Sequence, residues 1–277
     1  MILQVANGCS WNRCAFCEMY TEPQKKFNIK KSKEIIDEIR RTAQQFPDIR
    51  RVFLADGDAM VLSTRRLLSL LKAIGEFFPS VTRVSSYCLP RNVRHKSVQE
   101  LQELRDAGLG MLYVGVESGD DEVLRRVNKG ETRASCADAL LKIKAANIKS
   151  SVMILNGLGG VDLSRQHALH SAHLINDVQP DFLSILVVSL PLGEKRFRSG
   201  FPVNFRLLDK RLLFQELGTF IANTELDSTV FRSDHASNYL ALKGVLRKDK
   251  GRLLSTIDDA IHRPDTVPLR PEWQRGL

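Results

Sequence analysis

Short apolar runs alternate with amphipathic segments through residues 1–190, and this alternation limits the folds open to the chain. The runs are rich in Val, Ile and Leu, and most are nearly continuously apolar, as is typical of strands buried on both faces. The segments between them repeat apolar residues at helical spacing, as Ile35, Ile36 and Ile39 do. We expect strands at residues 2–8, 52–56, 84–89, 111–117, 151–156 and 182–190.

Repeated strand–helix units predict parallel strands joined by right-handed crossovers. The expected fold class is therefore α/β, as a partial (β/α)6 TIM-like barrel with a helical C-terminal extension. A doubly wound sheet is the alternative, because periodicity does not show whether a sheet curls. The barrel is expected to span residues 1–190, with the extension, residues 191–277, packed on it.

Local signals place several helix ends. Ser97 followed by Glu100 predicts a capping box at a helix start, and Ser32, Ser63 and Ser164 are further expected N-caps. Two helices are expected in the extension, at residues of about 209–223 and 250–261.

Five cysteines, three of them within nine residues, do not form a disulfide framework. Cys9, Cys14 and Cys17 lie on one short loop after the first expected strand. Three thiolates leave one iron of a [4Fe–4S] cluster open to a substrate or cofactor, whereas four close the cluster. A zinc site completed by a distant fourth ligand is the alternative. Cys88 and Cys136 are scattered and are expected to be small buried residues.

Polar residues and glycines also follow the expected strands, in the segments Asp56-Gly57-Asp58, Glu117-Ser118 and Asn156-Gly157. Each alone fits an ordinary turn or strand end. Together they lie at strand C-termini, where α/β barrels carry their sites, so they are candidates for one site.

The cysteine motif, the strand before it and the strand–helix alternation resemble the radical S-adenosylmethionine (SAM) superfamily. The spacing here is C-x4-C-x2-C, one residue longer than the commonest C-x3-C-x2-C signature of that superfamily. The resemblance implies a [4Fe–4S] cluster on Cys9, Cys14 and Cys17, with SAM bound at the open iron. It also implies that SAM is cleaved reductively to a 5′-deoxyadenosyl radical.

The same resemblance implies roles for the candidate site residues. Asp56-Gly57-Asp58 looks like the acidic segment that meets the SAM ammonium, and Glu117-Ser118 is similar to the ribose-contacting position. Phe16 corresponds to an aromatic near the adenine, and Lys129 to a basic residue near the SAM carboxylate. The residues 153–160, with the turn Asn156-Gly157, look like the segment that lines the adenine.

Residues 113–130 resemble sequences of methylthiotransferases and anaerobic coproporphyrinogen oxidases, although the extra cluster-binding domain of the methylthiotransferases is absent here. The segments FLADGDAM and SDHASNYL resemble uncharacterised short radical SAM proteins. The implied function is radical chemistry on an unidentified small-molecule or RNA substrate, with an external electron donor. No catalytic residue beyond the cofactor ligands is assigned.

A net charge of +9 raises the question of a nucleic-acid partner. The basic runs contain no stacking motif or nucleic-acid-binding module, so a solvated surface is favoured over an RNA groove, and an anionic small substrate fits equally well. A non-catalytic zinc- or RNA-binding protein is the alternative function. No run is long enough to cross a membrane and the N-terminus lacks a secretory signal, so we expect a cytoplasmic protein with no membrane partner.

Three weaker signals favour structural roles. His167, His170 and His173 are expected on a partly exposed helical face, because their spacing spreads them around the helix. The segment SDHASNYL, residues 233–240, is expected either to close the barrel or to cap a turn. Arg91 follows the third expected strand and is expected to be structural or solvated rather than a substrate ligand.

Overall fold

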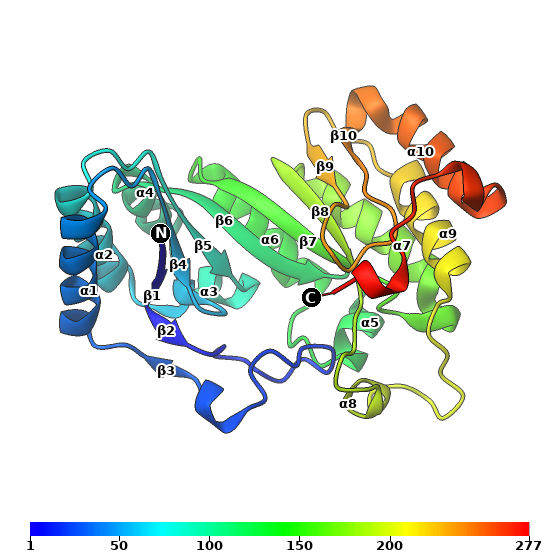
Figure 1. Ribbon diagram of the computed structural model, residues 1–277, viewed down its shortest axis with the longest axis horizontal. Coiled ribbons are helices and arrows are strands. Elements are labelled where there is room, and N and C mark those ends of the chain that lie inside the picture. Colours follow the sequence, from blue (N-terminus) through cyan, green and yellow to red (C-terminus); the bar gives the residue numbers. More distant parts are fainter. Residues whose placement is uncertain (277) are drawn as a thin grey trace. The chain divides into compact units, whose positions relative to one another are not determined.

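The computed structural model describes residues 1–276 and contains one main sheet flanked by helices (Figure 1). The strands are β1 (Ile2–Gln4), β2 (Ala6–Asn7), β3 (Asn28–Ile29), β4 (Arg51–Ala55), β5 (Arg83–Cys88), β6 (Leu109–Glu117), β7 (Lys149–Asn156), β8 (Phe182–Val187), β9 (Val230–Arg232) and β10 (Lys243–Val245). The α-helices are α1 (Ser32–Gln45), α2 (Thr64–Phe77), α3 (Pro90–Arg94), α4 (Val98–Asp106), α5 (Asp121–Arg126), α6 (Arg133–Ala145), α7 (Gly160–Val178), α8 (Lys195–Arg198), α9 (Lys210–Ala222) and α10 (Leu246–His262). Short 3-10 helices lie at Pro23–Lys25, Ala59–Val61, Pro264–Thr266 and Glu272–Gln274.

The main sheet has the strand order β1-β4-β5-β6-β7-β8-β9-β10. Neighbouring strands pair in parallel from β1 through β6, and β9 pairs in parallel with β8. The last strand, β10, is antiparallel to β9. All six predicted strands are present, although the first is interrupted after Gln4 and the last ends at Val187. The short strands β9 and β10 were not expected from the sequence, because three residues are too few to show a period.

The chain divides into two compact units, and the first comprises Met1–Asn12, Met19–Gly115 and Asp138–Ser151. Its helices α1, α2 and α4 pack against one another in sequence. Apolar stripes on α1 and α2 bury Ile35, Ile39, Leu67 and Leu71. The predicted capping box is present at α4, where the Ser97 hydroxyl accepts a hydrogen bond from the Glu100 amide.

The three other predicted N-cap serines do not cap a helix through their side chains. Ser63 occupies the N-cap position of α2 but makes no side-chain capping bond. Ser32 is the first residue of α1, after the N-cap residue Lys31, and Ser164 lies within α7. The predicted N-cap position of Ser63 is confirmed, whereas the predictions for Ser32 and Ser164 were wrong because a serine before an apolar repeat fits several positions of a first turn.

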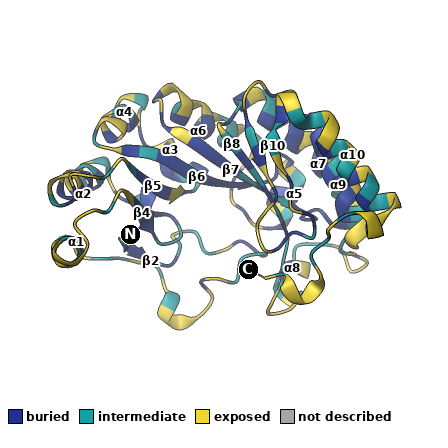
Figure 2. Ribbon diagram, turned by 45° about the horizontal axis from the view of Figure 1, so that its top comes forward, coloured by how far each residue is buried: buried dark blue, intermediate teal, exposed yellow. Residues whose placement is uncertain are grey.

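The second unit holds the remaining described residues, with β7 from Val152 onward, the strands β8 to β10 and the helices α7, α9 and α10. These helices pack as the pairs α7–α9 and α9–α10, and each buries one side and exposes the other (Figure 2). Both predicted extension helices are present as α9 and α10, and α10 begins earlier than expected, at Leu246.

The segment SDHASNYL connects β9 to β10. The Ser233 hydroxyl donates a hydrogen bond to the Leu240 carbonyl at 2.8 Å and accepts one from the Leu242 amide at 3.0 Å. The Asn238 side chain donates to the Ile185 carbonyl of β8 at 2.9 Å. Of the two expected roles, these bonds support the turn-forming one.

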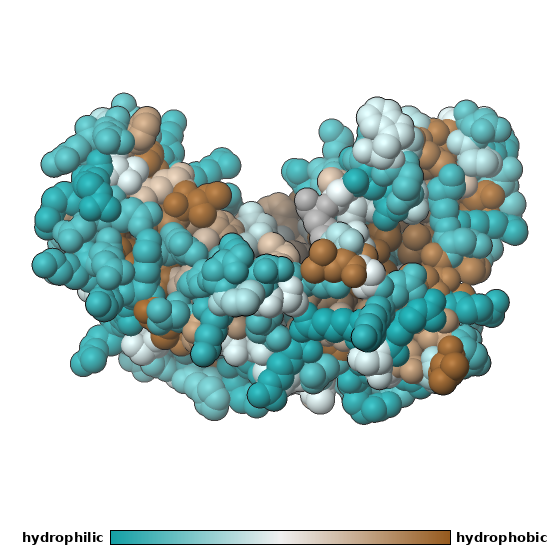
Figure 3. All heavy atoms as spheres, turned by 60° about the horizontal axis from the view of Figure 1, so that its bottom comes forward, coloured by the Kyte–Doolittle hydropathy of each residue, from teal (hydrophilic) through white to brown (hydrophobic). Residues whose placement is uncertain are grey.

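The surface shown in Figure 3 is largely hydrophilic. Two arginines of the basic run at α8 form hydrogen bonds within the protein. Arg196 donates to the Cys17 carbonyl, and Arg198 donates to the Phe205 carbonyl and the Glu194 carboxylate. Within residues 1–276, no helix combines the length and apolar character needed to cross a membrane.

Candidate functional site

In the first unit, the residues after β4 hold the start of the cysteine loop. Asp58 is fully buried, and its carboxylate accepts hydrogen bonds from the Ser10 amide at 3.0 Å, from the Ser10 hydroxyl and from Asn92. Burial raises the pKa of the Asp58 carboxyl, and the bonds from Ser10 and Asn92 offset only part of that effect. The adjacent Arg91 guanidinium lies 3.8 Å from the centre of the Trp11 ring, a cation–π contact that links Arg91 to the cysteine loop.

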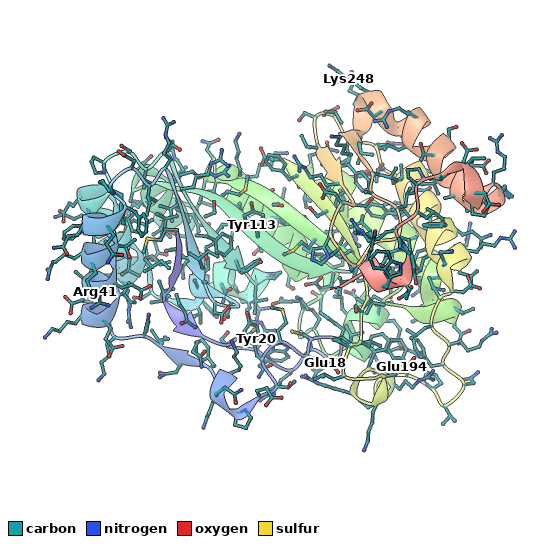
Figure 4. All side chains as sticks on the ribbon, in the orientation of Figure 1. Glu18, Tyr20, Arg41, Tyr113, Glu194 and Lys248 are labelled. Carbon is teal, nitrogen blue, oxygen red and sulfur yellow. The ribbon has the colours of Figure 1, made fainter. Side chains whose placement is uncertain are left out.

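Gly57 is needed for the close approach of the β4 end to the cysteine loop. A Cβ atom at this position would lie 2.8 Å from Cys9 Cβ and 2.9 Å from the Gly8 carbonyl oxygen. Such distances are too short for any larger residue. The hydroxyl of Tyr20, labelled in Figure 4, donates to the carboxylate of Asp56 at 3.0 Å, and Asp56 stays partly exposed.

In the second unit, backbone bonds fix the other end of the cysteine loop. The Ala15 amide donates to the Val127 carbonyl at 2.8 Å, and the Cys17 amide donates to the Cys14 carbonyl at 3.2 Å. Beyond the cysteines, the Glu18 carboxylate accepts from the Leu192 amide at 2.9 Å (Figure 4). These bonds hold the second half of the cysteine loop against the segments around Val127 and Leu192.

Phe16, Glu117 and Lys129 come together in the same unit as Cys14. Lys129 Nζ lies 3.0 Å from Glu117 Oε1, with both side chains buried, and 5.9 Å from the centre of the Phe16 ring. Burial by itself lowers the pKa of Lys129, but the Glu117 carboxylate and the Cys14 thiol outweigh it and the pKa is raised. The lysine is therefore charged at neutral pH, and it places a positive charge beside the cysteine loop.

Glu117 also has an unusual backbone conformation. It is the last residue of β6 and has a φ of 70°, in the left-handed region that residues other than glycine rarely adopt. Such a conformation persists only where the surrounding packing enforces it, and residues of this kind cluster at functional sites.

Ser118 turns into the protein. It is fully buried, and its hydroxyl lies 2.8 Å from His167 Nδ1 and accepts from the Asp120 amide at 3.0 Å. Both bonds fix the segment that follows β6. The Ser118 hydroxyl, at the position expected to contact ribose, is therefore hydrogen-bonded within the protein.

The turn Asn156-Gly157 is held from the C-terminal extension. The Asn156 side-chain amide donates to the Leu213 carbonyl of α9 at 3.0 Å. The Gly157 amide donates to Glu216 Oε1, also on α9, at 2.6 Å. Gly157 has a φ of 87°, so the turn requires glycine.

His167 does not lie on an exposed face as predicted. It is 1% exposed, and its Nε2 lies 3.0 Å from the Leu155 carbonyl oxygen. His170 and His173 are exposed as expected, and His170 bonds to Asp120. The prediction for His167 was wrong because its ring contacts polar atoms of Ser118 and Leu155 on neighbouring elements. The spacing of the histidines along the helix does not indicate those contacts.

The donor set of the loop fits an iron–sulfur cluster. Cys9, Cys14 and Cys17 are three soft thiol ligands within nine residues, which suit iron–sulfur clusters or zinc. The structure brings no three His, Cys, Asp or Glu side chains together as a preformed metal site anywhere in residues 1–276. Burial raises the pKa of the Cys136 thiol to about 12. Cys88 is buried as well, as expected.

Comparisons with known proteins agree with these observations. The family model of the Radical SAM superfamily matches residues 3–172. The chain is 24% identical to the heme chaperone HemW of Bacillus subtilis over 183 residues, which are 63% of this chain and 47% of that protein. The chain thus spans at most about half the length of the curated relatives it matches.

Solved structures show the same fold. Coproporphyrinogen III oxidase (HemN) from Escherichia coli has a TM-score of 0.59 and 16% identity, covering 80% of this chain and 51% of that chain. Methylornithine synthase (PylB) has a TM-score of 0.54 and 18% identity, covering 81% and 63%. The predicted α/β class with a partial TIM-like barrel is confirmed. Because the family model covers more than half of the 277 residues, the chain belongs to the radical SAM superfamily of enzymes, whose cofactors are a [4Fe–4S] cluster and SAM.

Proposed function

We propose that this chain binds a [4Fe–4S] cluster through Cys9, Cys14 and Cys17 and starts radical chemistry on a substrate that is not yet identified. When bound, the cluster supplies one electron that breaks the S–C5′ bond of SAM, giving methionine and a 5′-deoxyadenosyl radical. The observation that carries the proposal is the buried Glu117–Lys129 pair beside Phe16, in the same compact unit as Cys14. No comparable observation favours the alternative of a non-catalytic zinc- or RNA-binding protein.

Asp56 and Asp58 divide the role expected of the acidic segment. Asp58 is buried and bonded to Ser10, so we assign it to holding the cysteine loop. Asp56 lies two residues away, is partly exposed and has an acceptor oxygen for an ammonium group, so we assign it to the methionyl amino group of SAM. Gly57 provides the space for Cys9 between them.

The second unit supplies the groups proposed for the nucleoside and carboxylate of SAM. We assign Glu117 to the ribose, because a carboxylate accepts hydrogen bonds from a diol. Lys129 holds Glu117 and adds positive charge for the SAM carboxylate. We assign Phe16 and the turn Asn156-Gly157 to the adenine. Ser118 contributes by holding the strand end behind Glu117.

The wider assignments rest on charge and composition. We propose a barrel core over residues 1–190 with an extension over residues 191–277. We also propose a small-molecule or RNA substrate, which suits a chain of net charge +9.

An external electron donor is required, because reductive cleavage consumes one electron per SAM. Three cysteines within nine residues are typical of a metal motif rather than a disulfide framework, and such motifs favour a reducing compartment, so we propose a cytoplasmic location.

The test is anaerobic reconstitution with iron and sulfide, followed by SAM, dithionite and an assay for 5′-deoxyadenosine. We expect product from the wild-type chain and none from Cys14→Ala. Cys88→Ala is the matched control, because it removes a buried thiol outside the loop and should keep both cluster and product. A colourless protein that holds one zinc and forms no 5′-deoxyadenosine would refute the proposal.

A further inference from the structure

A buried glutamate on α9 has no role in the function proposed above. Glu216 is 3% exposed, and its Oε1 accepts from the Gly157 amide at 2.6 Å. Its Oε2 makes no hydrogen bond of ordinary geometry among the described residues, although the Ser164 side chain of α7 interacts with the same carboxylate. Burial of so sparsely bonded a carboxylate costs free energy, so packing alone does not account for an acid at this position.

His167 connects the same place to a second part of the site. Its Nε2 lies 3.8 Å from Glu216 Oε1 and 3.0 Å from the Leu155 carbonyl oxygen. Since a carbonyl oxygen only accepts, Nε2 carries the proton, and Nδ1 accepts from the Ser118 hydroxyl at 2.8 Å. The Ser118 hydroxyl also accepts a hydrogen bond from the Asp120 amide. Each polar hydrogen in this hydrogen-bond network therefore has one acceptor.

A cavity of about 10 Å³ adjoins the pair. Its polar lining comes from Asn156, His167 and Glu216, and its apolar lining from β7, β8, α7 and α9. That volume admits about one water molecule beside these polar groups. The carboxylate therefore borders a small, mostly apolar cavity that the side chains of Asn156 and His167 also line.

We propose that Glu216 and His167 form a positioning pair that holds two segments of the SAM site in register. Glu216 fixes the Gly157 amide, and His167 fixes Ser118 directly after Glu117. The pair lies on α7 and α9, so the C-terminal extension contributes to cofactor binding without touching the cofactor. This inference rests on the proposed SAM-binding function.

The direct test replaces Glu216 by Met, which keeps the side-chain length but removes the acceptor. We expect the Kd for SAM, measured by calorimetry on the reconstituted protein, to rise about tenfold, as loss of a buried acceptor predicts. Glu216→Gln should restore binding to within about threefold, because its amide oxygen can accept from Gly157. Gln215→Ala, at an exposed position on the same helix, is the matched control and should leave Kd unchanged.

A second readout needs no cofactor. Amide hydrogen exchange at Gly157 should be faster in Glu216→Met than in the wild type, Glu216→Gln or Gln215→Ala. Should Glu216→Met fail to fold, Ser118→Ala interrupts the same network more mildly, and we expect the Kd for SAM to rise about threefold.

The outcomes separate the two proposals. Faster exchange at Gly157 with an unchanged Kd for SAM would limit Glu216 to a structural role and overturn the inference, as would an unchanged Kd in Ser118→Ala. A wild-type chain that carries a cluster but neither binds SAM nor forms 5′-deoxyadenosine would instead refute the proposed function.

Discussion

At the residue scale, Gly57 determines whether the cysteine loop can reach its position. A methyl group there would lie within 3 Å of Cys9 Cβ and of the Gly8 carbonyl oxygen. We expect Gly57→Ala to lower the unfolding free energy by about 1–3 kcal/mol through overpacking and to remove most of the cluster iron. Iron content per chain after reconstitution and urea unfolding measure these effects.

Gly75 provides the control for that prediction. It lies within α2, and a Cβ there would meet no atom within 4 Å. Gly75→Ala should therefore stabilise the chain by about 0.5–1 kcal/mol and leave iron loading unchanged. Normal iron content in Gly57→Ala would contradict the role given to Gly57.

The Glu117–Lys129 pair gives a second prediction at this scale. Lys129→Met leaves a buried carboxylate without its cation, and we expect a loss of about 3–5 kcal/mol of unfolding free energy. Lys142→Met removes the half-buried partner of the exposed Asp138 and should cost less than about 1 kcal/mol. Urea unfolding of both variants tests the difference, and equal losses would show that burial of the first pair is unimportant.

At the scale of elements, the helix starts differ in how they are stabilised. The α4 capping box satisfies two backbone amides, since Ser97 accepts from Glu100 and the Glu100 carboxylate accepts from the Ser97 amide at 2.8 Å. We expect Ser97→Ala to cost about 1 kcal/mol. Ser63→Ala is the matched control at the N-cap of α2, where the serine makes no side-chain bond, and it should cost almost nothing. Thermal unfolding of both variants measures the two losses of stability. A loss in Ser63→Ala as large as that in Ser97→Ala would contradict the difference between the two caps.

At the scale of the whole molecule, the C-terminal extension belongs to the second unit rather than to a separate domain. Helix α9 buries Leu213, Phe214, Leu217 and Phe220, and β9 covers the edge of β8. A chain ending at residue 190 would lack α9 and β9, and would therefore expose the apolar surface that α9 covers and the free edge of β8. We expect such a chain to aggregate or to lack cooperative unfolding.

A chain ending at residue 262 keeps α9, α10 and the added strands and serves as the comparison. It should unfold cooperatively, as judged by calorimetry, with at most a modest loss of stability. Cooperative unfolding of the 190-residue chain at the wild-type temperature would show that the extension is dispensable for the fold.

Local patterns in the sequence determined the six main strands, the cysteine loop and the acidic and glycine residues at the strand ends. These features are readable because periodicity, capping and ligand spacing involve neighbours in the chain. The family resemblance added roles for Phe16, Glu117 and Lys129, and the structure brings these three side chains together.

Only the tertiary structure decided the partners of Gly157, Ser118 and Asp58. Glu216 meets Gly157 across 59 residues and His167 meets Ser118 across 49, so no local period contains either contact. A hydrogen bond depends on where a side chain lies in space, and a glutamate within an ordinary helix gives no sign in the sequence of the amide it will reach. The strands β9 and β10 were likewise decided by pairing, β9 with β8 and β10 with β9, because three residues acquire strand geometry from a neighbour rather than from their own pattern.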